Sequence, residues 1–266
     1  MTALDIHARP SALASSLGGA RTVVRLTALE LRLLIREPGV LIGLLGFPLV
    51  AVLVLAGVFG QAPDPEFAGV APDDHYLAGY VGVVLASLGL VTIPTHLATH
   101  RELGVLRRFR ASGLGAGALV ASEVALGTVL GVLAAAVVLG AGSAVYGVES
   151  PDDPLGVVAW FGVGLACFIA IGAALGSLVS SGRSAAALGN LLFVPMLLLG
   201  GGGPPRAVMT PAMQSIADVL PLSHVVGGLR QAWLGSTDDP HVLWWPLLVT
   251  ALALAVSVVS ARRRAD

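Results

Sequence analysis

The chain has 266 residues, of which 56% are hydrophobic and 12% charged, and its mean hydropathy is +0.88. A soluble domain carries about twice that share of charged residues. The apolar residues form long unbroken blocks without a period of 3.6 or 2, so the composition excludes an ordinary soluble domain and indicates a membrane protein.

The charged residues argue against a nucleic-acid-binding protein and against a chain with its own Walker A site for ATP. The net charge is −1, which gives no reason to expect a nucleic-acid partner, and all 15 basic residues are arginine. A Walker A loop needs a lysine to reach the terminal phosphates of ATP, so this sequence cannot contain one. Energy must therefore come from a gradient or from another subunit. Cys167 is the single cysteine, so no intrachain disulfide is expected.

Residues 1–37 form the predicted cytoplasmic N-terminus. Four basic residues share one narrow arc of a helix drawn over residues 21–36, opposite an apolar face: Arg21, Arg25, Arg32 and Arg36. This pattern predicts an amphipathic helix in the membrane interface. Glu30 projects from the middle of the apolar face. It therefore either has an arginine partner or lies at a poorly buried helix end.

Six apolar blocks are long enough to cross a bilayer, which takes about 20 residues of helix. The predicted spans are 38–60, 77–98, 124–146, 155–180, 185–200 and 242–261. Glycines and prolines at 200–205 fix the end of the fifth span, and Glu123 leaves the start of the third open to Ala116. The predicted fold is an all-α integral membrane protein, with one six-span domain over 38–261 and a tail at 262–266.

The arginines predict the orientation. With six spans, all arginines but Arg206 and Arg230 fall on one side, and the other side holds ten acidic residues. The positive-inside rule places the arginine-rich side, including both termini, in the cytoplasm.

Residues 99–113 form a short basic segment after the second span. Leu103, Leu106 and Phe109 recur every third residue among charged side chains. Composition alone favours a solvated loop that sets topology over a short helix that binds a cytoplasmic partner.

The stretch 204–240 is too apolar for a free external loop. Five of its residues lie on one helical face: Leu222, Val225, Val226, Leu229 and Trp233. Pro211 and Pro221 suit the first turns of short helices. We expect these helices to dip into the outer leaflet or to cap the bundle, shielded by protein.

Two smaller signals are weak. His96 and His100 stand four residues apart and could share a metal ion, but no third ligand is near in sequence, so interfacial histidines are the favoured interpretation. Gly172 with Gly176, and Gly127 with Gly131, have the spacing of close helix packing.

Three stretches resemble the ABC-2 type permeases, the membrane subunits of ATP-binding-cassette exporters, and most of all their antibiotic-resistance and natural-product branch. They are Leu26-Thr-Ala-Leu-Glu-Leu-Arg32 with Arg36-Glu-Pro38 and Phe47-Pro48; Arg101-Glu-Leu-Gly-Val-Leu-Arg-Arg-Phe-Arg-Ala-Ser112; and Ala217-Asp-Val-Leu-Pro-Leu-Ser-His-Val-Val-Gly-Gly-Leu-Arg230. One departure is Gly113, where the family often has proline.

The resemblance implies an export permease of the inner or plasma membrane without catalysis, metal or cofactor of its own. A second permease, identical or homologous, and two ATPase subunits that bind ATP and Mg²⁺ would complete the complex. Residues 21–36 would be the elbow helix, and the ATPase would contact a coupling segment that includes Glu102, Leu103, Gly104, Leu106, Arg107, Arg108 and Arg110. An apolar pathway suits a lipophilic drug, natural product or lipid.

Two other classes remain as alternatives. A gradient-driven secondary transporter often has ionisable groups or interrupted helices near mid-membrane, and the predicted spans hold no deep charged residue. A membrane-embedded enzyme would need a buried polar constellation, which the sequence does not indicate.

Overall fold

The computed structural model describes residues 12–36, 39, 42, 46–104, 116–147 and 150–262, and all regular structure in these ranges is helical. The elements are α1 (Ala12–Ile35), α3 (Phe47–Phe59), η2 (Pro65–Phe67), α4 (Pro72–Ser87), the π-turn η3 (Leu88–Thr92), α5 (Ile93–Glu102), α7 (Ala116–Tyr146), α8 (Pro154–Leu178), α9 (Gly182–Leu199), η4 (Arg206–Val208), α10 (Pro211–Ala217), α11 (Pro221–Leu234) and α12 (Trp244–Arg262).

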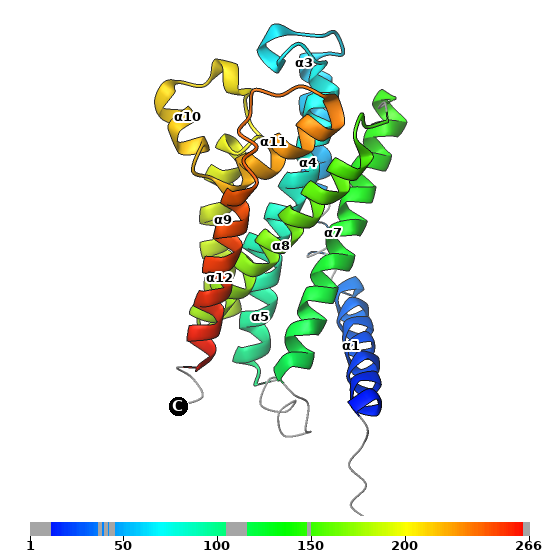
Figure 1. Ribbon diagram of the computed structural model, residues 1–266, viewed down its shortest axis with the longest axis vertical. Helices are drawn as coiled ribbons and strands as arrows, with labels where there is room; N and C mark the ends of the chain where they lie inside the picture. The colour runs from blue at the N-terminus through cyan, green and yellow to red at the C-terminus, as the bar shows by residue number, and fades with distance from the viewer. Residues whose placement is uncertain are drawn as a thin grey trace, which may run out of the picture.

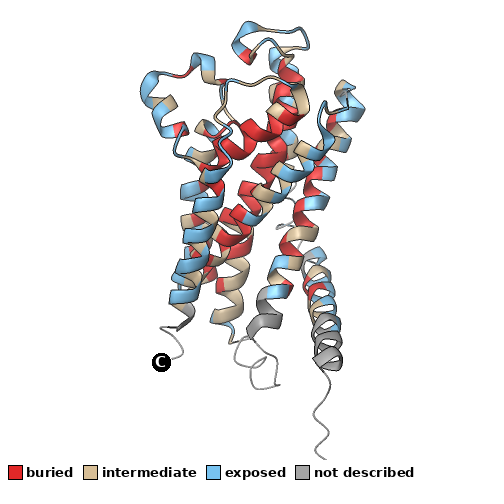
Figure 2. Ribbon diagram, viewed as in Figure 1, coloured by how far each residue is buried: buried red, intermediate tan, exposed pale blue. Residues whose placement is uncertain are grey.

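The helices form an elongated bundle around α4. Figure 1 shows that α1 begins, and α5 and α12 end, at the same end of this bundle, while α10 and α11 lie near the other. Nearly every residue of α4 is buried, and α3, α7, α8 and α11 pack against it. Burial is concentrated along α4, α8 and α11, whereas α12 and α9 expose apolar faces (Figure 2). These exposed faces are what a bilayer or a second subunit would cover.

Four helical stretches are long and apolar enough to cross a membrane: 65–102, 121–146, 154–178 and 182–199. Two further apolar helices, α3 and the described part of α12, are shorter. At 1.5 Å per residue, the 13 residues of α3 reach about 20 Å, less than the hydrocarbon core of about 30 Å. The multi-span helical fold is confirmed, and the count of six spans stays a prediction, since most of residues 37–45 lie outside the described ranges.

The second predicted span is longer than its apolar block. It runs without a break from Pro72 to Glu102 through the π-turn η3. Pro94 follows this turn and has no N–H to donate, so the α-helical hydrogen-bond ladder cannot continue unchanged across it. The backbones of η3 and α8 also touch here: a Cβ added to Gly89 would collide with the carbonyl oxygen of Phe168.

The glycine pairs serve close packing, as their spacing indicates. Gly172 and Gly176 face η3 and α5, where an added Cβ would meet the Gly89 carbonyl oxygen at 2.5 Å and the Pro94 Cα at 3.0 Å. An added Cβ on Gly127 would meet Ile169 at 3.0 Å. These contacts bring α5, α7 and α8 together at the lower half of the bundle.

The stretch between α9 and α12 contains two non-spanning helices, α10 and α11, whose first residues are Pro211 and Pro221. Leu222, Val225, Val226 and Leu229 are fully buried, because α11 packs against α4 and α8, and Trp233 is partly buried. Gly235 ends α11 in the left-handed conformation, with φ of 65°, that favours glycine. The helical periodicity of this segment is therefore realised as a packed helix.

Candidate functional site

Helix α1 lies along α7 with its basic arc outward. Its three arginines, Arg21, Arg25 and Arg32, are exposed, as is Arg36 directly after the helix, whereas Thr27 and Glu30 are buried. Thr27 and Glu30 are three residues apart and so share one face, and the Thr27 hydroxyl donates to the carbonyl oxygen of Ser122 at 3.5 Å. This contact sets the register that turns Glu30 toward the bundle.

Among the described residues, Glu30 has no arginine partner of the kind that the sequence left open. Its side chain is only 4% exposed, and neither carboxylate oxygen has a hydrogen-bond partner among the described residues. Burial raises the pKa of Glu30 to about 7; the charge of Glu123 acts in the same direction, and His96 acts against it. The charges that act on Glu30 thus belong to an acid and a histidine of two other helices.

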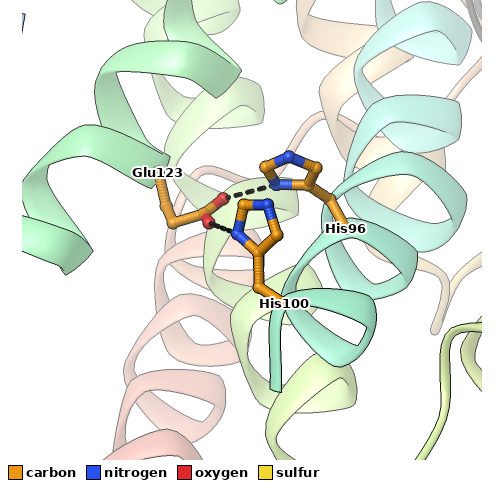
Figure 3. Close-up of side chains that lie close together, drawn as sticks. All are labelled: His96, His100 and Glu123. Carbon is orange, nitrogen blue, oxygen red and sulfur yellow. Dashed lines mark hydrogen bonds and ion pairs between the residues drawn. The ribbon is translucent and has the colours of Figure 1, made fainter. Parts of the chain in front are cut away.

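His96, His100 and Glu123 form one cluster between α5 and α7 (Figure 3). The Nδ1 atom of His96 lies 3.4 Å from one Glu123 carboxylate oxygen, and Nδ1 of His100 lies 3.8 Å from the other. All three side chains are less than one-fifth exposed. The sequence offered no third ligand for the histidine pair; the fold supplies one from α7. Thus three groups that can ligate a metal lie within 4.8 Å of one another.

The end of α5 is tied to the corner between α8 and α9. Arg101 donates to the carbonyl oxygen of Ser177 at 3.1 Å. The Glu102 carboxylate accepts the backbone N–H of Gly182, the first residue of α9, at 3.1 Å. A carboxylate at a helix N-terminus satisfies a free N–H and complements the helix dipole. This role of Glu102 was not predicted from the sequence.

The predicted coupling segment is described only at its start. Leu103 and Gly104 form a turn directly after α5, and the Leu103 side chain is exposed. Leu106, Arg107, Arg108 and Arg110 lie outside the described residues.

Near the opposite end of the bundle, Arg230 of α11 is buried and holds three segments together. Its guanidinium donates to the His75 carbonyl oxygen at 3.0 Å, to the Gly201 carbonyl oxygen at 2.6 Å and to the Asp239 carboxylate. The sequence predicts Arg230 on the external side and indicates no partner for it. The available signal was its spacing, because Arg230 stands four residues after Val226 and so continues the buried face.

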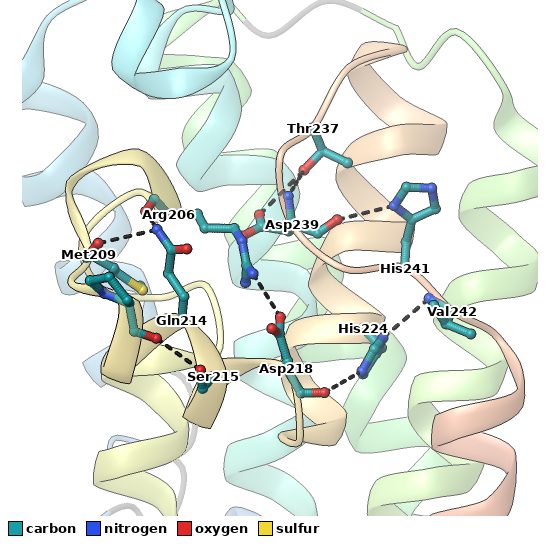
Figure 4. A network of polar contacts seen from close by, with 11 residues as sticks. Arg206, Met209, Gln214, Ser215, Asp218, His224, Thr237, Asp239, His241 and Val242 are labelled. Atoms are coloured by element: carbon teal, nitrogen blue, oxygen red, sulfur yellow. Dashed lines mark hydrogen bonds and ion pairs between the residues drawn. The ribbon is translucent and has the colours of Figure 1, made fainter.

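A second polar network connects α10, α11 and the start of α12 (Figure 4). Arg206 pairs with Asp218 at 2.8 Å. His224 donates from Nε2 to the Asp218 carbonyl oxygen and accepts the N–H of Val242 at Nδ1. Burial lowers the pKa of His224 from its ordinary value. A neutral imidazole satisfies both partners, so these contacts fix the path from α10 to α12.

The comparisons with known proteins place these elements in one family. The family model described as ABC-2 type transporter matches residues 22–234, from α1 through α11. No curated protein matches the chain in sequence.

Proposed function

The chain belongs to the ABC-2 type transporter family, and on this premise we propose that it is the membrane permease subunit of an exporter driven by a separate ATPase. Such a permease performs no chemistry. It supplies the element with two stable arrangements, inward-open and outward-open, between which ATP binding and hydrolysis on the partner would shift the population.

The observation that supports a separate ATPase is the absence of lysine from the sequence. Without a Walker A lysine these residues cannot form a P-loop, so the ATP-binding machinery of this transporter must lie outside them. The complex we propose contains two permeases, identical or homologous, and two ATPase subunits that bind ATP and Mg²⁺.

The end of α5 supports a route for energy transfer. A partner that pushes on the coupling segment would move Glu102, and the Glu102 contact with Gly182 would pass this motion to α9. Arg101 would pass it to the end of α8 through Ser177. The elbow helix α1 lies at the same end of the bundle (Figure 1) and offers its exposed arginines to the membrane surface or to the ATPase.

The substrate we propose is a lipophilic drug, natural product or lipid, exported from the cytoplasm. The support is the apolar surface of the bundle, because exposed residues of α9 and α12 are largely leucine, valine and alanine. A pathway between two such surfaces would favour apolar cargo.

A gradient-driven secondary transporter is the second candidate. The buried cluster of His96, His100 and Glu123 favours it, since ionisable groups on facing helices can relay protons. Family membership favours the ATP-driven mechanism, and the cluster stands close to the end of α5 rather than at mid-bundle.

Affinity capture from native membranes tests the proposal. Tagged chain, solubilised in mild detergent, should retain a protein with a Walker A motif in about equal amount, whereas Leu103→Asp, which places a charge on the exposed start of the coupling segment, should retain less. Glu66→Arg, an exposed change at the other end of the bundle, is the matched control. Capture of intact chain without any Walker A protein contradicts a separate ATPase subunit.

A further inference from the structure

Four ionisable side chains from three helices interact at the base of the bundle: Glu30 of α1, His96 and His100 of α5, and Glu123 of α7. Two of them are carboxylates, and among the described residues no arginine forms an ion pair with either. Leu31 and Leu126 belong to the apolar cluster beside them. Two carboxylates in such surroundings need a bound proton or a compensating cation.

The geometry of His96, His100 and Glu123 suits a small cation. A metal bound to nitrogen and oxygen at about 2.0–2.2 Å in tetrahedral geometry holds neighbouring ligand atoms about 3.4 Å apart. The Glu123 oxygens lie 3.4 Å from Nδ1 of His96 and 3.8 Å from Nδ1 of His100. The two imidazole rings stand 4.0 Å apart between centroids, since residues four apart occupy one face of a helix.

Glu30 provides the independent observation. Both of its carboxylate oxygens are inaccessible to solvent and without a hydrogen-bond partner among the described residues, although its charge is coupled to those of Glu123 and His96. Buried carboxylates are rarely left without partners. A cation held by the other three side chains would compensate the charge of this carboxylate.

We propose that His96, His100 and Glu123 bind one divalent transition-metal ion, with Zn²⁺ as the best match, and that the charge of the bound ion attracts Glu30 and so holds α1 against α5 and α7. Two imidazoles and one carboxylate leave the fourth position of a tetrahedral zinc ion to water, and Glu30 supplies the second negative charge that balances the 2+ ion. The hard ions Mg²⁺ and Ca²⁺ prefer six or more oxygen ligands, so this set disfavours them.

This attraction would act on the base of the bundle. In the described structure α1 meets α7 chiefly through packing and the long contact between Thr27 and Ser122. A metal held by His96 and Glu123 would attract the Glu30 carboxylate and so fix α1 against the helix that ends at Glu102. This inference concerns metal binding and helix docking, and its test needs neither a substrate nor the ATPase.

The experiment is a metal titration of the purified chain in detergent, with a histidine-free tag and after treatment with a chelator. Co²⁺ should bind at about one ion per chain with the intense ligand-field absorption of a four-coordinate site, and Zn²⁺ should displace it. Loss of a direct ligand should weaken binding by at least about 100-fold in His100→Asn and Glu123→Gln, since loss of an outer-sphere partner already costs about 10–100-fold. Glu30→Gln should weaken binding less and alter the Co²⁺ spectrum.

His241→Asn is the matched control, because His241 is exposed and remote in sequence from the cluster, and it should bind as the wild type does. Thermal unfolding gives a second readout if a variant folds poorly: Zn²⁺, and not Mg²⁺, should raise the midpoint of the wild-type chain. The proposal is overturned if the wild type binds no Co²⁺ or Zn²⁺ below millimolar concentrations. It is also overturned if Glu123→Gln and His241→Asn bind Zn²⁺ with the affinity of the wild type.

Discussion

At the scale of single residues, two arginine–aspartate pairs near the α10–α11 end of the bundle illustrate opposite uses of charge. Arg230 is 1% exposed and its partner Asp239 11%, whereas Arg206 and Asp218 are 20% and 49% exposed. Removing one member of a buried pair leaves the other charge without compensation, while in a partly exposed pair water replaces the lost partner at a smaller cost.

We therefore expect Arg230→Met to lower the free energy of unfolding by about 3–5 kcal/mol. Besides the ion pair, the substitution removes the hydrogen bonds that Arg230 donates to the carbonyl oxygens of His75 and Gly201. Arg206→Met, the control, should cost under about 1 kcal/mol. Denaturant unfolding in mixed micelles measures both. Similar losses in the two variants would contradict the assigned burial.

For single residues, the sequence predicts which face of a helix a side chain occupies, but not which residues of other helices it meets. The helical arc of α1 predicts that Glu30 points away from the arginines, and burial of Glu30 agrees. The charges that act on Glu30 come from α5 and α7, and the contact that sets this register joins residues 95 apart. Only the tertiary register determines such a pairing, so neither the third ligand of the histidine pair nor the Gly182 N–H that donates to Glu102 could be read from spacing.

At the scale of elements, the apolar blocks predict helices but not where helices join. The block 77–98 became part of a longer helix because polar residues at both ends, including Asp73, His75 and Arg101, continue it beyond the apolar core. The π-turn η3 cannot be recognised from the pattern of apolar residues, because it results from Pro94 and from the close contact with α8. Helix α11 was predictable because its 3.6-residue period survives in a segment too short to span.

The contact between η3 and α8 gives a prediction about packing. Gly89→Ala should reduce the yield of folded protein and lower stability by about 1–3 kcal/mol or more, because the new methyl group meets backbone atoms of Phe168 that cannot turn aside. Gly162→Ala, elsewhere on α8 and facing open space, should change stability by no more than about 1 kcal/mol. Size-exclusion profiles and thermal midpoints of both variants provide the measurement. Equal behaviour would show that η3 and α8 do not touch.

At the scale of the whole molecule, the helices run back and forth between the two ends of the bundle. The starts of α1 and α7 and the ends of α5 and α12 share one end (Figure 1), which is where the predicted cytoplasmic arginines gather in sequence. We propose that this end faces the cytoplasm.

Single cysteines in a Cys167→Ala background test this orientation. Glu66 and Leu103 are both exposed and lie near opposite ends of the bundle. Glu66→Cys should react with a membrane-impermeant maleimide in intact cells, and Leu103→Cys should react only after the cells are permeabilised. The reverse pattern would invert the topology, and labelling of both from outside would exclude the span arrangement.

The most direct test of the central claim measures ATP hydrolysis by the captured ATPase in liposomes, with and without this chain. The wild-type chain should raise hydrolysis above that of the ATPase alone. Glu102→Arg should abolish most of this stimulation, about tenfold or more, because loss of one charge-assisted contact costs about 1–3 kcal/mol. Glu102→Gln, which keeps an acceptor for the Gly182 N–H, separates the coupling role from the helix contact and should lose part of the stimulation. Glu66→Arg should match the wild type. Equal hydrolysis with and without the chain, or full stimulation by Glu102→Arg at normal abundance, would contradict an ATP-driven permease coupled through the end of α5.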